Sequence, residues 1–367
     1  MNDVPSRPGS PDDPAPPRSP GGPGSPAAGS AADPLADSAI VVVDKPAGMT
    51  SHDVVGRLRR IFGTRKVGHS GTLDPDATGV LVLGLGRGTR FLPHVHADAK
   101  SYAATMRLGA STLTDDAAGE VLARAAVADV EAVTDEAIRA GVADLTGDIM
   151  QVPAAVSAVK LDGVRAHERI RRGERVEIPP RRVTVSRFDV LAVRRIDGAG
   201  SPGDGSPDAG PWIDVDVEVD CSAGTFIRSL ARDLGAALGV GGHITALRRT
   251  AAGLFSLDDA IPLDHLLHLR EEAGAPLSPA GLDRALILDA ACVRCFPVRD
   301  VTDEEGAALS MGKWLEPVGL KGVHAARTPD GRVPALITES GKRARTVFVV
   351  RPSTLRPPTA VGPTGRA

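Results

Sequence analysis

The sequence predicts a protein of the α+β class. Strand-like and helix-like segments are mixed along the 367 residues, without the regular strand–helix–strand order of a doubly wound parallel sheet. Two segments, 183–193 and 212–219, alternate apolar and polar residues and predict an antiparallel pair of strands. Aromatic residues make up only 3% of the chain, so Val, Leu, Ile and Ala must form most of the core.

Residues 1–37 are expected to be a disordered tail. They hold 10 of the 30 prolines and no aromatic residue. Such a segment cannot bury enough apolar surface to offset the entropy lost on ordering. The tail and the whole chain both carry a net charge of −3, so the remaining 330 residues are neutral overall. This balance excludes a uniformly basic protein but allows a local basic face.

The first folded domain is expected over residues 38–270. The apolar run 39–43 predicts its first strand, and Ser51 is the candidate cap of a helix that ends at Ile61. Further strands are predicted at 79–86 and 101–108.

Later elements follow the same logic. Thr134 is positioned to cap a helix that ends at Ala143. The Gly- and Pro-rich segment 197–211 predicts a flexible insertion between the paired strands. Residues 225–238 predict a helix with an apolar face formed by Phe226, Leu230, Leu234 and Leu238.

A second, small domain is expected over residues 285–355. The Gly-, Pro- and Ser-containing segment 270–282 marks the boundary. Short strands are predicted at 318–323, 333–337 and 346–350.

The chain lacks the signals of a membrane or secreted protein. No apolar run reaches the ~20 residues of a membrane span, and the N-terminus has no apolar signal-peptide core. Three cysteines are too few for a disulfide framework. We therefore expect a cytoplasmic protein. The glycines at 84, 86 and 88 lack the spacing of a dinucleotide fingerprint, and Cys292-x-x-Cys295 lacks the second pair of a zinc site.

The segment GHSGTLDPDATGVL at 68–81 carries the strongest chemical signal. Pro75 pushes the backbone of Asp74 out of the helical region, and the glycines allow a tight chain path. A carboxylate in a rigid turn close to His69 suits a nucleophile or a general base. The same residue types also fit a purely structural Asx turn.

This segment closely resembles the catalytic segment of the bacterial tRNA pseudouridine-55 synthases, the TruB family. The resemblance spans about residues 40–260 and continues weakly to about 350. The other matching segments follow in the family's order: VDKPAGMTSHDVV at 43–55, KSYAATMRLG at 100–109, TDDAAGEV at 114–121, QVPAAVSAVKLDGVRAHERIRRG at 151–173, CSAGTFIRSLARDLG at 221–235 and GHITALRRTAAG at 242–253.

The resemblance implies a fold and a reaction. The fold is the pseudouridine-synthase fold, with a mixed, largely antiparallel central sheet flanked by helices and a C-terminal domain like the RNA-binding PUA module. The reaction is isomerisation of uridine 55 in the tRNA T loop, on a flipped-out base, without cofactor or metal. The implied partner is the tRNA T stem-loop, and we expect a monomer with no obligate protein partner.

The resemblance also implies a role for each matching residue. Asp74 matches the nucleophile, and Arg228 matches the arginine that pairs with it. Tyr102 matches the tyrosine that stacks on the target base and takes part in removing the C5 proton. His69 matches the histidine that enters the RNA beside the flipped nucleotide, and Leu247 matches a leucine that lines the uridine site.

Lys45 and Pro46 match the segment beneath the catalytic loop. Two positions depart from the family pattern, because Phe226 and His167 stand where the family usually has tyrosines. The departures concern substrate contacts and leave the nucleophile intact.

The residue types alone leave alternatives open. Arg228 also fits a surface helix arginine, Tyr102 a core aromatic, and His69 a hydrogen-bonded turn residue.

The charge pattern agrees with an RNA substrate. Residues 57–90 and 165–187 each carry a net charge of +5, and Arg248 and Arg249 add a third cluster. Basic faces of this kind neutralise phosphates, although solvated helix faces give the same pattern. Two other functions fit the sequence: a non-catalytic RNA-binding or tRNA-folding protein with the same fold, and a pseudouridine synthase for another RNA.

Overall fold

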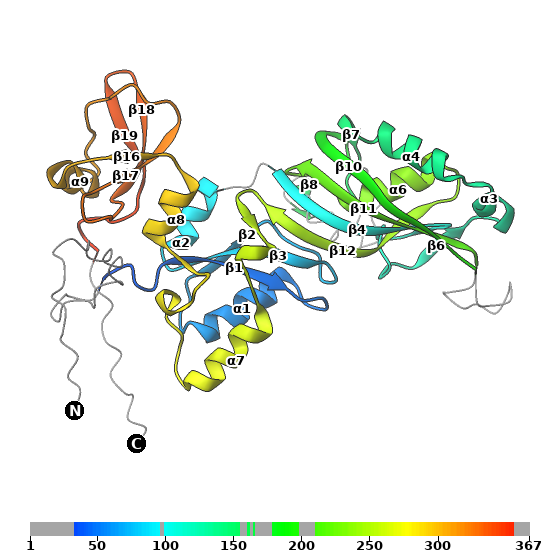
Figure 1. Ribbon diagram of the computed structural model, residues 1–367, viewed down its shortest axis with the longest axis horizontal. Coiled ribbons are helices and arrows are strands. Elements are labelled where there is room, and N and C mark those ends of the chain that lie inside the picture. The colour runs from blue at the N-terminus through cyan, green and yellow to red at the C-terminus, as the bar shows by residue number, and fades with distance from the viewer. Residues whose placement is uncertain are drawn as a thin grey trace, which may run out of the picture.

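The computed structural model describes residues 33–95, 99–154, 160–161, 164–165, 178–197 and 210–355. A long mixed sheet with helices on both faces forms the main body, and a small β domain lies at one end of it, beside α8 and α2 (Figure 1). The α+β class and the separate C-terminal β domain are confirmed. His167, most of the insertion 197–211 and most of the basic segment 165–187 lie outside the described residues.

The main sheet is mostly antiparallel, in the order β14-β1-β3-β12-β4-β11-β10-β7, with β2, β13 and β15 joined at its sides. Within it, β1–β14 and β3–β12 are parallel pairs. The strands are β1 (Ala39–Lys45), β2 (Val67–Ser70), β3 (Thr78–Leu85), β4 (Ala99–Leu108), β7 (Gly147–Gln151), β10 (Arg181–Ile196), β11 (Trp212–Ser222), β12 (Gly242–Ala252), β13 (Phe255–Ser256), β14 (Ala260–Pro262) and β15 (Leu286–Ile287).

Two short hairpins lie outside the main sheet: β5 (Ala110–Thr112) with β6 (Val121–Arg124), and β8 (Lys160–Leu161) with β9 (Val164–Arg165). The predicted antiparallel pair is confirmed as β10 and β11.

Helices cover the two halves of the main sheet. The helical elements are α1 (Ser51–Ile61), α2 (Gly88–Phe91), η1 (Leu92–Val95), α3 (Val127–Ala132), α4 (Asp135–Asp144), α6 (Ile227–Ala237), η2 (Leu257–Asp259), α7 (Leu263–Ala273), η3 (Pro279–Gly281) and α8 (Leu288–Cys295). One apolar core lies between α4, α6 and the strands β4, β10 and β11. Another lies between α1, α7 and the strands β1 and β3.

Helix α1 ends at Ile61 as predicted, but its cap is Thr50 and not Ser51. The Thr50 hydroxyl accepts from the Asp53 N–H at 3.1 Å, and the Asp53 carboxylate accepts from the Thr50 N–H at 2.9 Å. This reciprocal capping box satisfies two free backbone donors. Ser51 is left buried and available for a contact elsewhere.

Helix α6 begins at Ile227, two residues later than predicted. Phe226 is its N-cap residue and is not part of the apolar face. The side-chain amide of Gln151 holds both backbone polar groups of Phe226: the Phe226 N–H donates to Oε1 at 2.8 Å, and Nε2 donates to the Phe226 carbonyl at 3.1 Å. Helix α4 is capped by Thr134, as predicted.

The C-terminal domain is a four-stranded sheet with one helix. Its elements are β16 (Val298–Asp300), α9 (Asp303–Ser310), β17 (Val323–Arg327), β18 (Ala335–Ser340) and β19 (Arg343–Val349). The strand predicted at 318–323 begins only at Val323, so the prediction is wrong for residues 318–322. The N–H groups of Val318, Gly319 and Leu320 donate to the Glu339 carboxylate and not to the carbonyls of a neighbouring strand.

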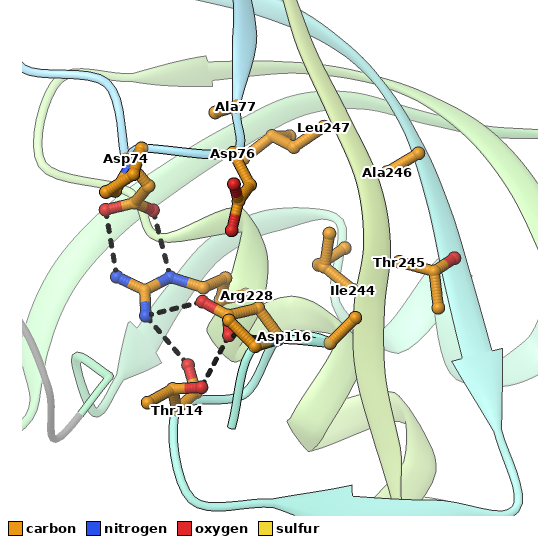
Figure 2. Close-up of a pocket in the computed structure, with 13 residues that line it drawn as sticks. Asp74, Asp76, Ala77, Thr114, Asp116, Arg228, Ile244, Thr245, Ala246 and Leu247 are labelled. Carbon is orange, nitrogen blue, oxygen red and sulfur yellow. Dashed lines mark hydrogen bonds and ion pairs between the residues drawn. The ribbon is translucent and has the colours of Figure 1, made fainter. Parts of the chain in front are cut away.

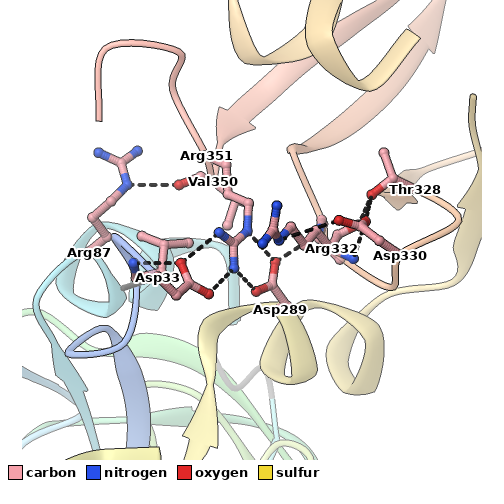
Figure 3. Close-up of polar contacts among 10 residues, drawn as sticks. Asp33, Arg87, Asp289, Thr328, Asp330, Arg332, Val350 and Arg351 are labelled. Carbon is pink, nitrogen blue, oxygen red and sulfur yellow. Dashed lines mark hydrogen bonds and ion pairs between the residues drawn. The ribbon is translucent and has the colours of Figure 1, made fainter. Parts of the chain in front are cut away.

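Residues 33–37, placed in the tail by their composition, form a turn that packs on the body. Leu35 is only 2% exposed. Arg351 joins this turn to the rest of the molecule: it binds both Asp33 oxygens at 2.8 Å and also pairs with Asp289 on α8 (Figure 3). Nearby, Arg87 donates to the Val350 carbonyl at 2.9 Å. The ordered body therefore begins at least five residues before the predicted boundary.

The Asp33–Arg351 pair is charged over most of the pH range. The Arg351 hydrogen bonds lower the pKa of Asp33 to about 2. A carboxyl whose pKa is depressed by folding stabilises the native state above its unfolded pKa, and loses that contribution as the pH falls through the folded value.

We expect truncation before residue 33 and truncation before residue 38 to differ. Removing residues 1–32 leaves every described contact intact, so the melting temperature should not change. Removing residues 1–37 also removes Leu35 and Asp33, which should lower the free energy of unfolding by about 2–4 kcal/mol. Each kcal/mol should lower the melting temperature by about 2–4 °C. Thermal unfolding of both truncations measures the difference. Equal melting temperatures would show that the 33–37 turn contributes nothing.

Candidate active site

The loop that carries Asp74 is anchored from three different elements. It runs from the end of β2 to the start of β3. The hydroxyl of Ser51 on α1 accepts from the Leu73 N–H at 2.9 Å. Lys45 Nζ at the end of β1 donates to the Pro75 carbonyl at 2.8 Å. Arg249 Nη2 on β12 donates to the Gly71 carbonyl at 3.0 Å. The loop is therefore rigid because of backbone contacts to distant side chains.

Lys45 is fully buried beneath the loop. Its ammonium also donates to the carbonyls of Pro46 and Met49, at 2.8 and 2.7 Å. Burial lowers its pKa to about 8, against the opposite effect of Asp76 and Asp74. The structure thus places Lys45 under the loop, as the resemblance implied, whereas Pro46 is exposed and contributes only its carbonyl to Lys45.

Gly79 allows β3 to approach β12 closely at this point. Its φ is +99°, and a Cβ atom would lie 2.2 Å from the Arg249 carbonyl oxygen. Any other residue would separate the two strands and move Arg249 away from Gly71.

Asp74 and Arg228 form a bidentate ion pair at the centre of the site (Figure 2). Arg228 Nε lies 3.0 Å from Asp74 Oδ2, and Nη2 lies 3.2 Å from Oδ1. The arginine side chain is 7% exposed, and the aspartate side chain is 42% exposed. The carboxylate is therefore held on one side by a buried guanidinium and is open on the other.

Asp116 and Thr114 complete the shell around Arg228. Arg228 Nη1 donates to the Thr114 carbonyl at 2.7 Å and to Asp116 Oδ2 at 3.2 Å. All three guanidinium nitrogens are thus engaged. No role was assigned to Asp116 from the sequence, although it lies in the segment TDDAAGEV. The match of this segment to the family was the one signal in the sequence that pointed to Asp116. No local pattern could show its contact with Arg228, because the two residues are 112 positions apart.

Opposing effects act on the pKa of Asp74. Burial in the recess raises the pKa and Arg228 lowers it; Asp116 raises it further, and Lys45 lowers it. The net shift is upward. A reaction that needs the carboxylate should therefore slow, on acidification, at a higher pH than an ordinary aspartate would dictate.

Two cavities meet at Asp74. A cavity of about 360 Å³ is lined by Asp74, Lys100, Tyr102, Arg181, Phe226, Arg228 and Leu247, among others. A second, of about 400 Å³, lies on the side of Asp76, Thr114 and Asp116 (Figure 2). Asp74, Arg228 and Leu247 line both.

The structure brings together most of the predicted site residues. Asp74, Tyr102, Phe226, Arg228 and Leu247 line one cavity. His69 on β2 lines neither of the two cavities. It is half-buried, and its Nδ1 atom has no hydrogen-bond partner among the described residues.

Two cations with no individual role predicted from the sequence lie on the wall of the cavity, although Arg181 belongs to the basic segment 165–187. Lys100 and Arg181 both line it, and the Arg181 guanidinium lies 5.9 Å from the centre of the Phe226 ring. These cations are suited to contact a phosphate near a bound nucleotide.

Two further features concern the described residues only. No group of three or more His, Cys, Asp or Glu side chains is placed to hold a metal ion. No described helix is long and apolar enough to cross a membrane.

Two solved structures share the fold of this chain. The chain is similar to the crystallised Cbf5–Nop10–Gar1 complex, with a TM-score of 0.60 and 26% identity over 88% of each chain. It is also similar to an H/ACA RNP bound to a substrate RNA containing 2′-deoxyuridine, with a TM-score of 0.59 and 24% identity over 88% of each chain. The second likeness supports the fold alone.

Family models and close relatives then define the family. The model described as TruB family pseudouridylate synthase (N terminal domain) matches residues 59–227. The tRNA pseudouridylate synthase B C-terminal domain model matches residues 228–287, and the model for the C-terminal part of tRNA pseudouridine synthase II matches 296–351.

Relatives named tRNA pseudouridine synthase B include those of Corynebacterium efficiens, 60% identical, and Corynebacterium aurimucosum, 62% identical, each over 88% of this chain and 99% of the relative. The relative from Rhodococcus jostii is 53% identical over 88% of this chain and 97% of its own length. The chain belongs to the TruB family, which confirms the resemblance found in the sequence, and it is an isomerase of the pseudouridine-synthase class.

Asp116→Asn should test the shell around Arg228. Removing this charge weakens a charge-assisted hydrogen bond worth about 1.5–3 kcal/mol, so the isomerisation rate should fall roughly 10–100-fold. Because Asp116 raises the pKa of Asp74, the acidic limb of the pH–rate profile should also move to lower pH. Single-turnover rates across pH measure both effects.

Glu120→Gln is the matched control for Asp116→Asn. Glu120 is exposed in the same segment, and its loss of charge should leave the rate and the acidic limb unchanged. A limb that moves to higher pH in Asp116→Asn would contradict the assigned electrostatics.

Proposed function

We propose that this protein converts uridine to pseudouridine at position 55 in the T loop of tRNA, with Asp74 as nucleophile. The observation that carries the proposal is the Asp74 carboxylate, held by a buried arginine and open to a cavity that Tyr102 also lines. The names of the close relatives, tRNA pseudouridine synthase B, support tRNA as the substrate. A tRNA substrate agrees with the cytoplasmic location expected from the sequence.

The reaction needs a carboxylate and no redox change. The C1′–N1 bond breaks, the uracil turns, and a C1′–C5 bond forms. A carboxylate can attack the base or the sugar, or it can take a proton from C2′, and glycosidases use carboxylates at an equivalent carbon. The bidentate guanidinium favours the ionised carboxylate against the desolvation of the recess. This arrangement supports Asp74 in any of these routes.

The 360 Å³ cavity fits the proposed flipped-out uridine. Flipping a base costs a few kcal/mol, which stacking and apolar contact recover. Tyr102, the chain's single tyrosine, is the aromatic candidate for stacking, and Leu247 supplies apolar surface beside Asp74. The Tyr102 hydroxyl is also the proposed acceptor of the C5 proton after the new bond forms. Phe226 supplies a ring but no hydroxyl.

The basic clusters contribute unequally to the proposed RNA surface. On α1, Arg57, Arg59 and Arg60 are exposed and available to phosphates. Arg87 instead binds the C-terminal domain. The expected third cluster is not a free cationic surface, because Arg248 pairs with Asp44 at 2.6 Å and Arg249 is fully buried.

We also propose that the C-terminal domain, expected over residues 285–355, is an RNA-binding, PUA-like domain. Within those bounds β15 pairs with β1 of the main sheet, and the separate sheet begins at β16. Trp314 is 45% exposed there, and the Arg343 guanidinium lies 4.8 Å from the centre of its ring. An exposed aromatic ring beside arginine is a common stacking surface for unpaired bases. The remaining part, residues 38–270, is the proposed catalytic domain.

Asp74→Asn should abolish pseudouridine formation and leave tRNA binding nearly intact. The amide keeps the shape of the side chain and loses the nucleophilic charge. Chemical mapping of pseudouridine in tRNA incubated with purified protein measures the activity, and filter binding measures the affinity. Asp129→Asn, an exposed change on α3, is the control. Wild-type turnover by Asp74→Asn would overturn the nucleophile assignment.

The same mapping tests the alternative functions. A wild-type protein that binds tRNA but leaves every uridine unchanged would favour the non-catalytic RNA-binding or tRNA-folding role. Pseudouridine appearing in another RNA, and not at tRNA position 55, would favour the other synthase.

A further inference from the structure

Arg249 is a buried cation that the proposed chemistry has not yet used. It lies on β12 and is 0% exposed. Its Nε donates to the Val80 carbonyl at 2.7 Å, and its Nη2 donates to the Gly71 carbonyl at 3.0 Å. Its Nη1 has no hydrogen-bond partner among the described residues, and no described carboxylate forms an ion pair with it. A buried charge with carbonyl partners only is costly to keep.

The guanidinium lies beside Tyr102. Arg249 and Tyr102 are direct partners in the antiparallel pairing of β12 with β4, so their side chains project from the same face of the sheet. The guanidinium and the phenol oxygen attract each other electrostatically. Tyr102 itself is 8% exposed and lines the cavity that contains Asp74.

The charged and titratable groups around the phenol come from every neighbouring element. Burial is the largest effect and raises the pKa of Tyr102. Arg249 on β12 lowers it, whereas Cys221 on β11 and Asp74 on the loop raise it. Lys100, two residues away on β4, faces Arg249 across Gly71. Arg249 is therefore the main group that favours a charged phenol oxygen.

We propose that Arg249 is a positioning residue for the reaction: it holds the loop at Gly71 and faces the Tyr102 hydroxyl with a positive charge, so that this oxygen can accept the C5 proton. The inference rests on the proposed function. In that step Tyr102 enters as the phenolate, and the C5–H bond breaks. The phenolate takes the C5 proton, and the C5–H electron pair forms the C5=C6 bond. The C6=N1 π pair moves onto N1, which takes a proton from water, and the resulting phenol later returns its proton to water.

A single tyrosine in 367 residues makes this proposal directly measurable. Tyrosinate ultraviolet absorbance, followed against pH in the free protein, reports Tyr102 alone. The variants are Arg249→Met, Arg249→Gln and Arg249→Lys. The control is Arg248→Met, which removes the same charge from the opposite face of the same strand, where Arg248 pairs with Asp44.

The expected result is an upward shift of the Tyr102 midpoint by about one pH unit in the Met and Gln variants, a tenfold change in the ionisation constant. Arg249→Lys keeps a cation and should stay near the wild-type midpoint, and Arg248→Met should not move it. In single-turnover assays on tRNA, the rise of the rate with pH should extend to correspondingly higher pH in the Met and Gln variants.

An unchanged midpoint in a folded Met or Gln variant would overturn the proposal, as would a rate profile that ignores the shift of the midpoint. Circular dichroism and thermal unfolding establish which variants fold. If neither neutral variant folds, the wild type still tests the proposal, because its rate must keep rising up to the measured Tyr102 midpoint. The titration needs no RNA, so a failure of tRNA pseudouridylation would be recognised separately.

Discussion

The ion pair between Asp74 and Arg228 sets the requirements for the rest of the active site. A guanidinium that is 7% exposed must find partners for its nitrogens. These partners come from the loop before β3 and from the turn at 114–116, whereas Arg228 itself lies at the start of α6. Helix α6 must therefore begin at a defined residue, and the Gln151 amide bound to both backbone groups of Phe226 fixes that start. The fold brings together segments far apart in the sequence so that a guanidinium opposes the effect of burial on the pKa of one carboxylate.

A second principle is that the cations beneath the loop bind carbonyl oxygens and not carboxylates. Lys45 contacts three carbonyls, and Arg249 contacts two. A carbonyl fixes the position of a cation without neutralising its charge. The loop is therefore rigid and also lies in a positive field, which favours the ionised form of Asp74. Carboxylate partners at the same positions would give equal rigidity and cancel that field.

The sequence predicted features that depend on local periodicity. The alternation in 183–193 and 212–219 predicted β10 and β11, because one face of each strand packs on the core. The cap predicted at Thr134 is confirmed. The cap predicted at Ser51 is wrong, because the capping box forms between Thr50 and Asp53, three residues later. The apolar spacing also led to the wrong prediction that Phe226 lies on the apolar face of the helix. Its true position depends on Gln151, 75 residues away, which no local pattern reveals.

The site residues divide in the same way. The motif around Asp74 was visible because its glycines, proline and aspartate are adjacent in the chain. Asp116 and Lys100 were given no role, and Arg181 was counted only within the basic segment 165–187, because only the fold places these residues near Asp74. Composition also misplaced Leu35 and Asp33: a proline-rich neighbourhood predicts disorder, yet one buried leucine and one ion pair to Arg351 suffice to attach the turn.

Arg228 and Arg249 have different partners, and this difference explains how one site can hold both the Asp74 carboxylate and the Tyr102 phenol. Arg228 contacts two carboxylates and a carbonyl, so its charge is balanced by Asp74 and Asp116 and it holds Asp74 in place. Among the described residues, Arg249 contacts carbonyls and Tyr102 but no carboxylate, so its charge remains available to the phenol. The two arginines belong to different elements, α6 and β12, and of the two only Arg228 lines the cavities. In the proposed reaction, α6 thus supplies the cation beside Asp74, and β12 supplies the cation beside Tyr102.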